Sequence, residues 1–165
     1  MPNLIINKED LEFSKFGDGE QFGAERAEVG AKVGANKLGY GVVRLPPGKR
    51  AWPYHAHHVI EEAFFILAGH GTLRHADEHH PAREGGFICA PPDPTQPHQI
   101  INTSDESLTY IAISTNESTD ICLYPDSDKF GVWHTRSKDR SDPKNFHVFS
   151  RKSNGVDYWD GESDE

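Results

Sequence analysis

A histidine pair and a nearby glutamate constrain this chain more than any other feature. His55 and His57 lie two residues apart, so in a strand both side chains would point to one face and could bind one metal ion. The odd spacing from His57 to Glu62 requires a turn, after which Glu62 would open a strand over residues 62–68. His98 supplies a third imidazole later in the chain. The sequence therefore predicts a metal site of His55, His57, Glu62 and His98.

The strand that follows Glu62 predicts an apolar setting for this site. Its even-numbered members share the face of Glu62 and would place Phe64 and Ile66 beside the metal. Several ionisable groups held in an apolar barrel without a partner would be costly. A metal ion that binds all four side chains removes that cost.

The spacing of these residues resembles that of the cupin family. The first cupin motif runs glycine, His-x-His, glutamate and glycine, and it is matched by Gly48, His55, His57, Glu62 and Gly69. The second motif is matched by Gly85, Pro91, His98 and Asn102. The chain departs from the pattern in three places. Six residues rather than five separate Gly48 from His55, Asp93 replaces an inner glycine, and two extra residues precede His98.

This resemblance covers residues 38–115 and implies both a fold and a cofactor. The fold would be all-β, a double-stranded β-helix or cupin jelly-roll barrel with N- and C-terminal extensions. Residues 1–165 would form a single cupin domain, with a core over about 38–124, a polar leader over 1–36 and an extension over 125–165. The cofactor would be one divalent ion per chain, with manganese, iron, nickel, copper and zinc all open.

Composition agrees with one compact domain and excludes several partners. A chain of 165 residues can bury a sizeable core, and 15 glycines with 11 prolines favour many turns and short strands. The net charge of −9 argues against nucleic acid and against anionic membranes. The apolar run at residues 4–6 is too short for a signal peptide, so we expect a cytoplasmic protein.

Short apolar runs separated by turns predict the strands. We expect an edge strand within 21–29, a loop over 76–84 and no long helix. The polar tail is expected to wrap the barrel or a partner subunit, and a homodimer would cover the sheet edges. The other expected strands span residues 38–45, 62–68, 71–75, 87–90, 98–102, 108–114 and 121–124.

Other polar residues have simpler interpretations. Cys89 and Cys122 lie in apolar runs and are expected to be buried and reduced. His58 and Glu61 are expected to form a solvated or second-sphere pair. Of the remaining histidines, His70 is expected to be exposed in a turn. A solvated hairpin tip would hold His75, His79 and His80. Two histidines of the tail, His134 and His147, could contribute to a pocket.

Four protein ligands would leave open positions on the ion for a small-molecule substrate with adjacent oxygens. An ion that polarises a carbonyl suits isomerisation or epimerisation of a sugar or sugar phosphate, and the site type resembles that of mannose and glucose phosphate isomerases among the cupins. An iron-dependent oxygenase and a non-catalytic sensor or binding protein are the alternatives. Glu62, Tyr110 or a water on the ion would carry the proton, although Tyr110 and Tyr124 also suit a plain core role. An anionic substrate group could be held by Arg44, Lys49 or Arg50.

Overall fold

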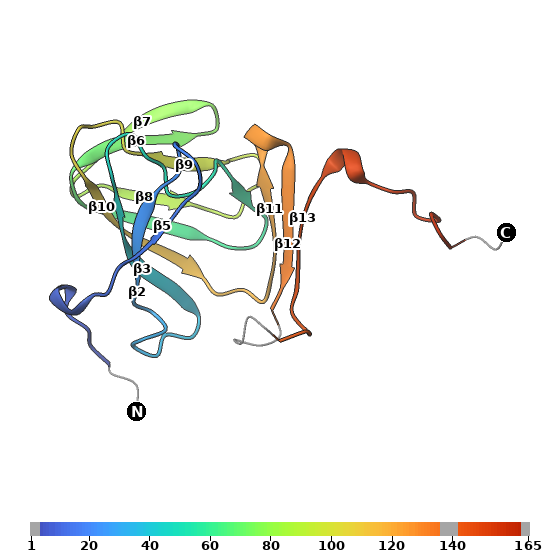
Figure 1. Ribbon diagram of the computed structural model, residues 1–165, viewed down its shortest axis with the longest axis horizontal. Helices are drawn as coiled ribbons and strands as arrows, with labels where there is room; N and C mark the ends of the chain where they lie inside the picture. The colour runs from blue at the N-terminus through green and yellow to red at the C-terminus, as the bar shows by residue number, and fades with distance from the viewer. Residues whose placement is uncertain (1–3, 136–141, 163–165) are drawn as a thin grey trace.

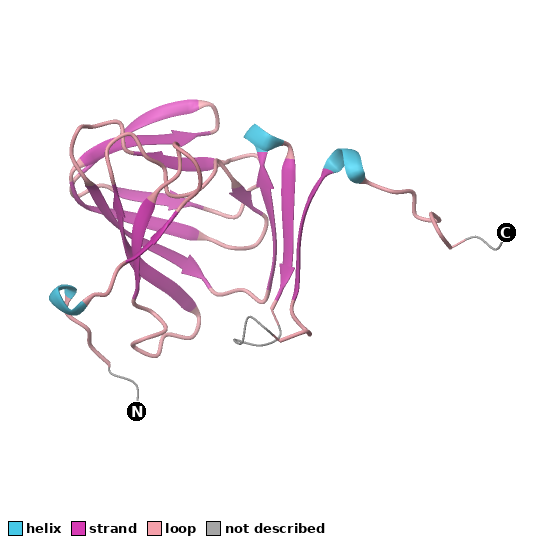
Figure 2. Ribbon diagram, in the orientation of Figure 1, coloured by secondary structure: helices cyan, strands magenta, loops and turns pink. Residues whose placement is uncertain are grey.

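The computed structural model describes residues 4–135 and 142–162, and strands dominate it (Figure 2). The helical segments are three single 3₁₀ turns, η1 (Lys8–Asp10), η2 (Pro125–Ser127) and η3 (Lys152–Asn154). Within the described ranges, none of the helices has the length and apolar character needed to cross a membrane.

One wall of the barrel is a six-stranded sheet with the order β1-β2-β3-β10-β5-β8. All of its neighbouring strands run antiparallel. Its strands are β1 (Ser14–Phe16), β2 (Ala24–Glu28), β3 (Leu38–Leu45), β5 (Glu62–Ala68), β8 (Phe87–Ala90) and β10 (Leu108–Thr115).

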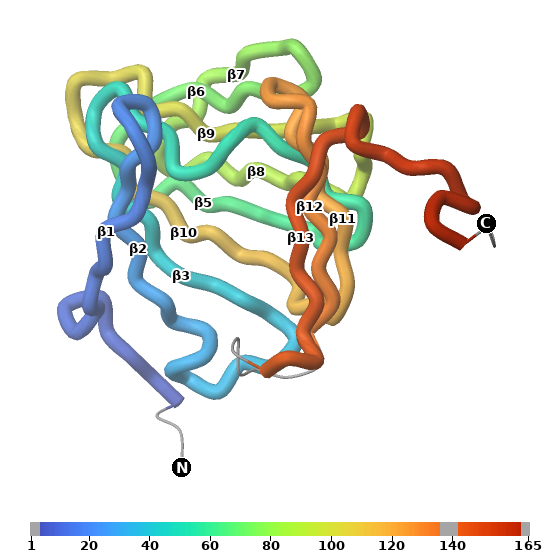
Figure 3. Tube along the Cα trace, turned by 45° about the vertical axis from the view of Figure 1, so that its right-hand side comes forward, coloured from blue at the N-terminus to red at the C-terminus, as the bar shows by residue number. Residues whose placement is uncertain are grey.

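The opposite wall consists of two smaller antiparallel sheets, β7-β6-β9 and β13-β12-β11-β4 (Figures 1 and 3). An isolated antiparallel bridge between His55 and His98 links them at the metal motif. The strands are β4 (Ala56–His57), β6 (His70–His75), β7 (Glu78–Arg83), β9 (His98–Ile101), β11 (Thr119–Tyr124), β12 (Lys129–His134) and β13 (Phe146–Arg151).

The hydrophobic core fills the space between the walls. Leu45, Ile66, Leu108 and Tyr110 are almost completely buried within one cluster. Their positions follow the two-residue alternation of strands, which turns every second side chain inward. The architecture is the predicted double-stranded β-helix, and the expected strands from residue 38 to 124 are present to within two residues at each end.

Two motif residues have structural roles that keep the barrel closed. Gly69 joins β5 to β6 with a φ of 81°, and a Cβ atom there would lie 2.5 Å from the carbonyl oxygen of Ser107. Only glycine therefore fits this turn. Asn102 is fully buried, and its amide nitrogen donates to the carbonyl oxygens of Leu45 and Glu106, both at 2.7 Å.

The structure corrects three expectations. Residues 76–84 are not a loop, because β6 and β7 form a hairpin that turns at Ala76 and Asp77, both with positive φ. The predicted strand within 21–29 is present as β2, but β1 covers its outer edge. Cys89 is exposed rather than buried, because it lies on the outward face of β8.

The C-terminal segment is more ordered than a wrapping tail. β12 pairs with β11, β13 pairs with β12, and together they extend the second wall. Beyond β13 the chain runs away from the barrel as an arm over residues 152–162 (Figures 1 and 3).

Candidate metal centre

Three of the predicted ligands, all imidazoles, converge on one carboxylate oxygen of the fourth, Glu62. Glu62 opens β5, and its Oε2 lies 3.4 Å from the Nε2 atoms of His55 and His57 and 3.0 Å from the Nε2 of His98. His57 ends the short strand β4, His55 lies just before it, and His98 opens β9. The backbone N–H of His98 donates to the carbonyl oxygen of His55 at 2.8 Å, so the sheet fixes these two ligands relative to each other.

These separations fit a shared metal ion. Two donor atoms that each lie about 2.1 Å from an ion are about 3.0 Å apart at a right angle and about 3.4 Å apart at a tetrahedral angle. The ligand atoms of His55, Glu62 and His98 all lie within 4.8 Å of one another. His57 joins them through its 3.4 Å approach to Glu62. The donor set of imidazole nitrogens and one carboxylate oxygen suits a first-row divalent ion.

Hydrogen bonds orient two of the imidazoles toward Glu62. The Nδ1 of His55 lies 2.7 Å from the carbonyl oxygen of Pro53, which can only accept, so Nδ1 carries the proton. The Nδ1 of His57 lies 2.5 Å from Oδ2 of Asp120, a fully buried carboxylate on β11. Oδ1 of Asp120 accepts the backbone N–H of Val59 at 2.9 Å. Such outer partners fix the tautomer and leave Nε2 free to bind the ion.

The electrostatics keep the glutamate ionised. Burial opposes the charge of Glu62, but hydrogen bonds from His55, His57 and His98 hold its pKa well below the usual value. Burial also lowers the pKa of His98. For His57, burial acts in the same direction, yet the hydrogen bonds with Asp120 and Glu62 outweigh it and raise the pKa to about 9. Without an ion, this raised pKa keeps His57 protonated at neutral pH.

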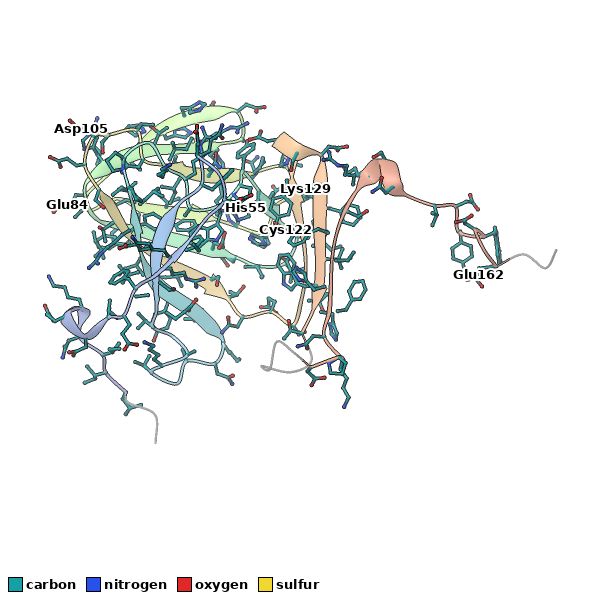
Figure 4. All side chains as sticks on the ribbon, viewed as in Figure 1. His55, Glu84, Asp105, Cys122, Lys129 and Glu162 are labelled. Carbon is teal, nitrogen blue, oxygen red and sulfur yellow. The ribbon has the colours of Figure 1, made fainter. Side chains whose placement is uncertain are left out.

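Cys122 on β11 is a further donor beside the site. Its Sγ lies within 4.8 Å of ligand nitrogens of both His55 and His57, and Figure 4 shows Cys122 next to His55. Burial raises the pKa of its thiol to about 12, so the thiol is protonated at neutral pH. Cys122 is buried and free, as predicted, but its position beside the predicted metal site was not expected from the sequence.

A cavity of about 250 Å³ opens onto the ligands. Trp52 and Tyr124 form aromatic parts of its wall, and Trp133 reaches it from β12 in the C-terminal extension. The Trp133 ring packs edge-on to His57 with centroids 6.1 Å apart. The volume suits a small metabolite, and the mixed apolar and polar lining is typical of a ligand site.

A smaller inner pocket of about 20 Å³ joins Glu62 and His98 to Tyr110 and Phe64. It has room for about one water molecule. Burial, with the nearby charge of Glu62, raises the pKa of Tyr110 above its usual value. Phe64 lies beside His98 as predicted, with ring centroids 5.7 Å apart, whereas Ile66 belongs to the core and lines neither cavity.

Most of the other predicted polar residues lie away from the site. His58 and Glu61 are exposed, as expected, and so is His70. His79 and His80 are exposed on strand β7 rather than in a turn. The two tail histidines, His134 and His147, do not line the cavity, although His147 packs edge-on to Trp133.

The basic residues expected to hold a substrate anion also point elsewhere. Arg44 stacks on Phe13 at 3.7 Å from the ring centroid. Arg50 donates to the Gln21 side chain at 2.9 Å, and Lys49 donates to the carbonyl oxygen of Glu20. Arg26 on β2 lines the cavity instead.

The family assignment rests on the strands that carry these ligands. The cupin domain model matches residues 41–114, which run from β3 to β10 and include the four ligands. Residues 41–114 form a cupin domain. The cupin domain thus contains the four predicted ligands, whereas Arg26, Asp120, Cys122 and Trp133 lie outside it.

Several solved structures share the fold of this chain. A provisionally assigned sugar phosphate isomerase from Acidithiobacillus ferrooxidans is 25% identical with a TM-score of 0.69, covering 80% of each chain. A sugar phosphate isomerase of the cupin superfamily from Silicibacter pomeroyi is 22% identical with a TM-score of 0.76, covering 94% of this chain and 98% of the other. A predicted oxalate decarboxylase from Thermotoga maritima is 21% identical with a TM-score of 0.57, covering 68% of this chain and 99% of the other. A comparison with proteins of curated function found no match.

Proposed function

We propose that this cupin is a metal-dependent enzyme that isomerises or epimerises a sugar or sugar phosphate. The observation that carries the proposal is the convergence of three imidazole nitrogens on Oε2 of Glu62, where His55, His57 and Glu62 also line an open cavity. Four protein ligands on an ion that accepts five or six leave room for a substrate with adjacent oxygens. A bound divalent ion would supply the Lewis acidity that polarises a carbonyl group.

The residues of the chain would move the proton. The pKa of Glu62 is held low, so the carboxylate is ionised at neutral pH and can accept a proton. The pKa of Tyr110 is raised, so its hydroxyl keeps its proton and can donate a hydrogen bond. Environments that shift the pKa values of two neighbouring groups in opposite directions are typical of acid and base partners. We therefore retain Glu62 and Tyr110 as the proposed catalytic residues.

The cavity walls support a small polar substrate. Trp52, Tyr124 and Trp133 offer flat apolar surfaces, while Ser114 adds a hydroxyl group on the same lining. The similarity to the structure from Acidithiobacillus ferrooxidans, a provisionally assigned sugar phosphate isomerase, supports the same substrate class.

Solvent exchange tests this function directly. We expect the metal-loaded protein to exchange a substrate proton with deuterium from the buffer when aldoses, ketoses and their phosphates are screened by NMR. Exchange should proceed without dioxygen and should be lost in Tyr110→Phe while the metal content stays the same. Dioxygen uptake without exchange would replace the isomerase with an iron-dependent oxygenase. Tight binding of a small molecule without either reaction would indicate a sensor or binding protein.

A further inference from the structure

Arg26 is the basic side chain that the structure places in the cavity. Of the described residues that line the cavity, it is the sole arginine or lysine, and it shares that lining with His55, His57 and Glu62. It projects from β2, opposite Val43 of β3. Because the chain has a net charge of −9, a positive charge beside the predicted ligands does not simply follow from the overall charge of the protein.

The neighbouring residues hold the Arg26 side chain in place. Gly41 lies on the adjacent strand, and a Cβ atom there would come within 3.5 Å of Nε of Arg26. The Cζ atom of Arg26 lies 5.9 Å from the ring centroid of Trp52, which also lines the cavity. Nη2 of Arg26 pairs with Oε1 of Glu28 at 2.8 Å. Packing and one ion pair therefore keep the guanidinium at the cavity.

The guanidinium is incompletely hydrogen-bonded in this position. Among the described residues, Nε of Arg26 is buried and has no hydrogen-bond partner. A guanidinium carries five N–H donors, and its pair with Glu28 uses a single Nη2 atom. The side chain keeps 32% of its surface exposed, so other donors remain accessible. A cation beside a cavity that lacks some of its hydrogen-bond partners is suited to bind a ligand that supplies acceptors.

We propose that Arg26 binds an oxyanion of the substrate, a phosphate monoester or a carboxylate, while the other end of the substrate reaches the ligands of the metal site. Anion binding by Arg26 is independent of the proposed function, whereas the contact of the substrate with the metal site rests on it. Arginine matches such groups because its planar donors can meet two oxygens at once. The substrate would then be held at two points of one cavity, which fixes its orientation.

Calorimetric titration of the metal-loaded protein with inorganic phosphate and, separately, with acetate tests the proposal. Arg26→Gln should weaken binding of the preferred anion by about tenfold or more, since hydrogen bonds to charged groups are worth this much. The matched control Arg44→Gln makes the same charge change on β3 and should alter affinity less than twofold. Glu28→Gln frees the guanidinium and should tighten binding. The anion that binds more tightly identifies the group as phosphate or carboxylate.

Metal content serves as the folding control, because Arg26 is not a ligand and Arg26→Gln should retain the ion. Anion affinity within twofold of the wild type in a metal-loaded Arg26→Gln protein would overturn the proposal. Absence of binding of both anions to the wild type would overturn it as well. This outcome can be told apart from that of the isomerase proposal. If Arg26→Gln loses anion binding and the wild type exchanges no sugar proton, the role of Arg26 is upheld and the reaction is rejected.

Discussion

The carboxylate of Asp120 accepts a hydrogen bond from Nδ1 of His57 at 2.5 Å, although 63 positions separate the two residues in sequence. Asp120 is fully buried and also accepts the backbone N–H of Val59. The pair therefore ties β11 to the metal motif and fixes the orientation of one imidazole.

Replacing Asp120 by Asn should weaken metal binding. The amide keeps the shape of the side chain but loses the charge that supports the Nδ1–H of His57. Affinity should fall by about 10- to 100-fold, the usual effect of removing an outer partner of a ligand. Competition with a chromophoric chelator measures the change. Asp126→Asn, which removes an exposed partner of Arg74, is the control, and equal affinities in both variants would contradict the role of Asp120.

His57→Ala should abolish stoichiometric metal. The variant removes one of the three imidazoles around Glu62, and the loss of a ligand from a four-ligand site destabilises the bound ion. Elemental analysis of protein purified without a histidine tag provides the measurement. His58→Ala is the matched control because its side chain is exposed on the next residue. Full retention of the ion in His57→Ala would refute the ligand assignment.

Metal binding should release a proton near neutral pH. Without an ion, the pKa of His57 is raised from 6.5 to about 9, so the ring is charged at pH 7.5 and must lose a proton when it binds the metal. Affinity should therefore rise with pH until about pH 9. Calorimetry in buffers of different ionisation enthalpy counts the released protons. A count near zero would show that His57 is already neutral.

The same shift predicts how the stability of metal-free protein depends on pH. The folded pKa of His57 lies above the unfolded value of 6.5, so this residue contributes stability that is fully present below that value. The contribution is lost as the pH rises through about 9. Thermal unfolding of chelator-treated protein should show the loss, and His57→Gln should remove this part of the pH dependence.

Asn102→Ala should destabilise the barrel without affecting the metal. The substitution leaves the buried carbonyl oxygen of Leu45 without its donor and removes three further hydrogen bonds. We expect a loss of about 2–3 kcal/mol in the free energy of unfolding, typical of unpaired buried polar groups. Urea denaturation gives the value. Asn116→Ala, at an exposed asparagine with a bond to Asn36, should cost clearly less.

A homodimer remains our expectation for the assembly. No described strand pairs with the outer edge of β13, where Phe146 and Phe149 are 54% and 53% exposed. The arm beyond it exposes Tyr158 and Trp159, so exposed aromatic side chains lie on two consecutive segments. A second copy would cover both. Light scattering should report a dimer that Phe146→Asp dissociates, whereas Phe87→Asp, on β8, should leave it intact.

The sequence predicted that His55, His57 and Glu62 come together because their spacing is local, whereas His98 was assigned through the resemblance to the second cupin motif. His55 and His57 share a face through the two-residue period of a strand, and the spacing to Glu62 encodes a turn. Asp120 and Arg26 were missed because strand pairing brings them to the site from outside the motif segment. An isolated aspartate or arginine in a strand carries no local signal of what it will face.

The errors in the fold have similar physical causes. We expected a loop over residues 76–84, but β7 is an edge strand, where Pro81 is tolerated. The apolar run at Phe87 suggested a buried strand, yet Phe87 is 84% exposed and Cys89 shares its face. An apolar run does not reveal which of its two faces meets the core.

The position of Trp133 in the cavity wall has a consequence for how this scaffold could diversify. The ion site is built from β4, β5 and β9, whereas Trp133 and Arg26 enter from strands on either side of the cupin domain. Part of the cavity wall is thus contributed by stretches of the chain outside the segment that carries the four predicted ligands. Grafting the two flanking segments from one such protein onto another would exchange these parts of the cavity wall, but the grafted segment would have to keep Asp120, which orients His57.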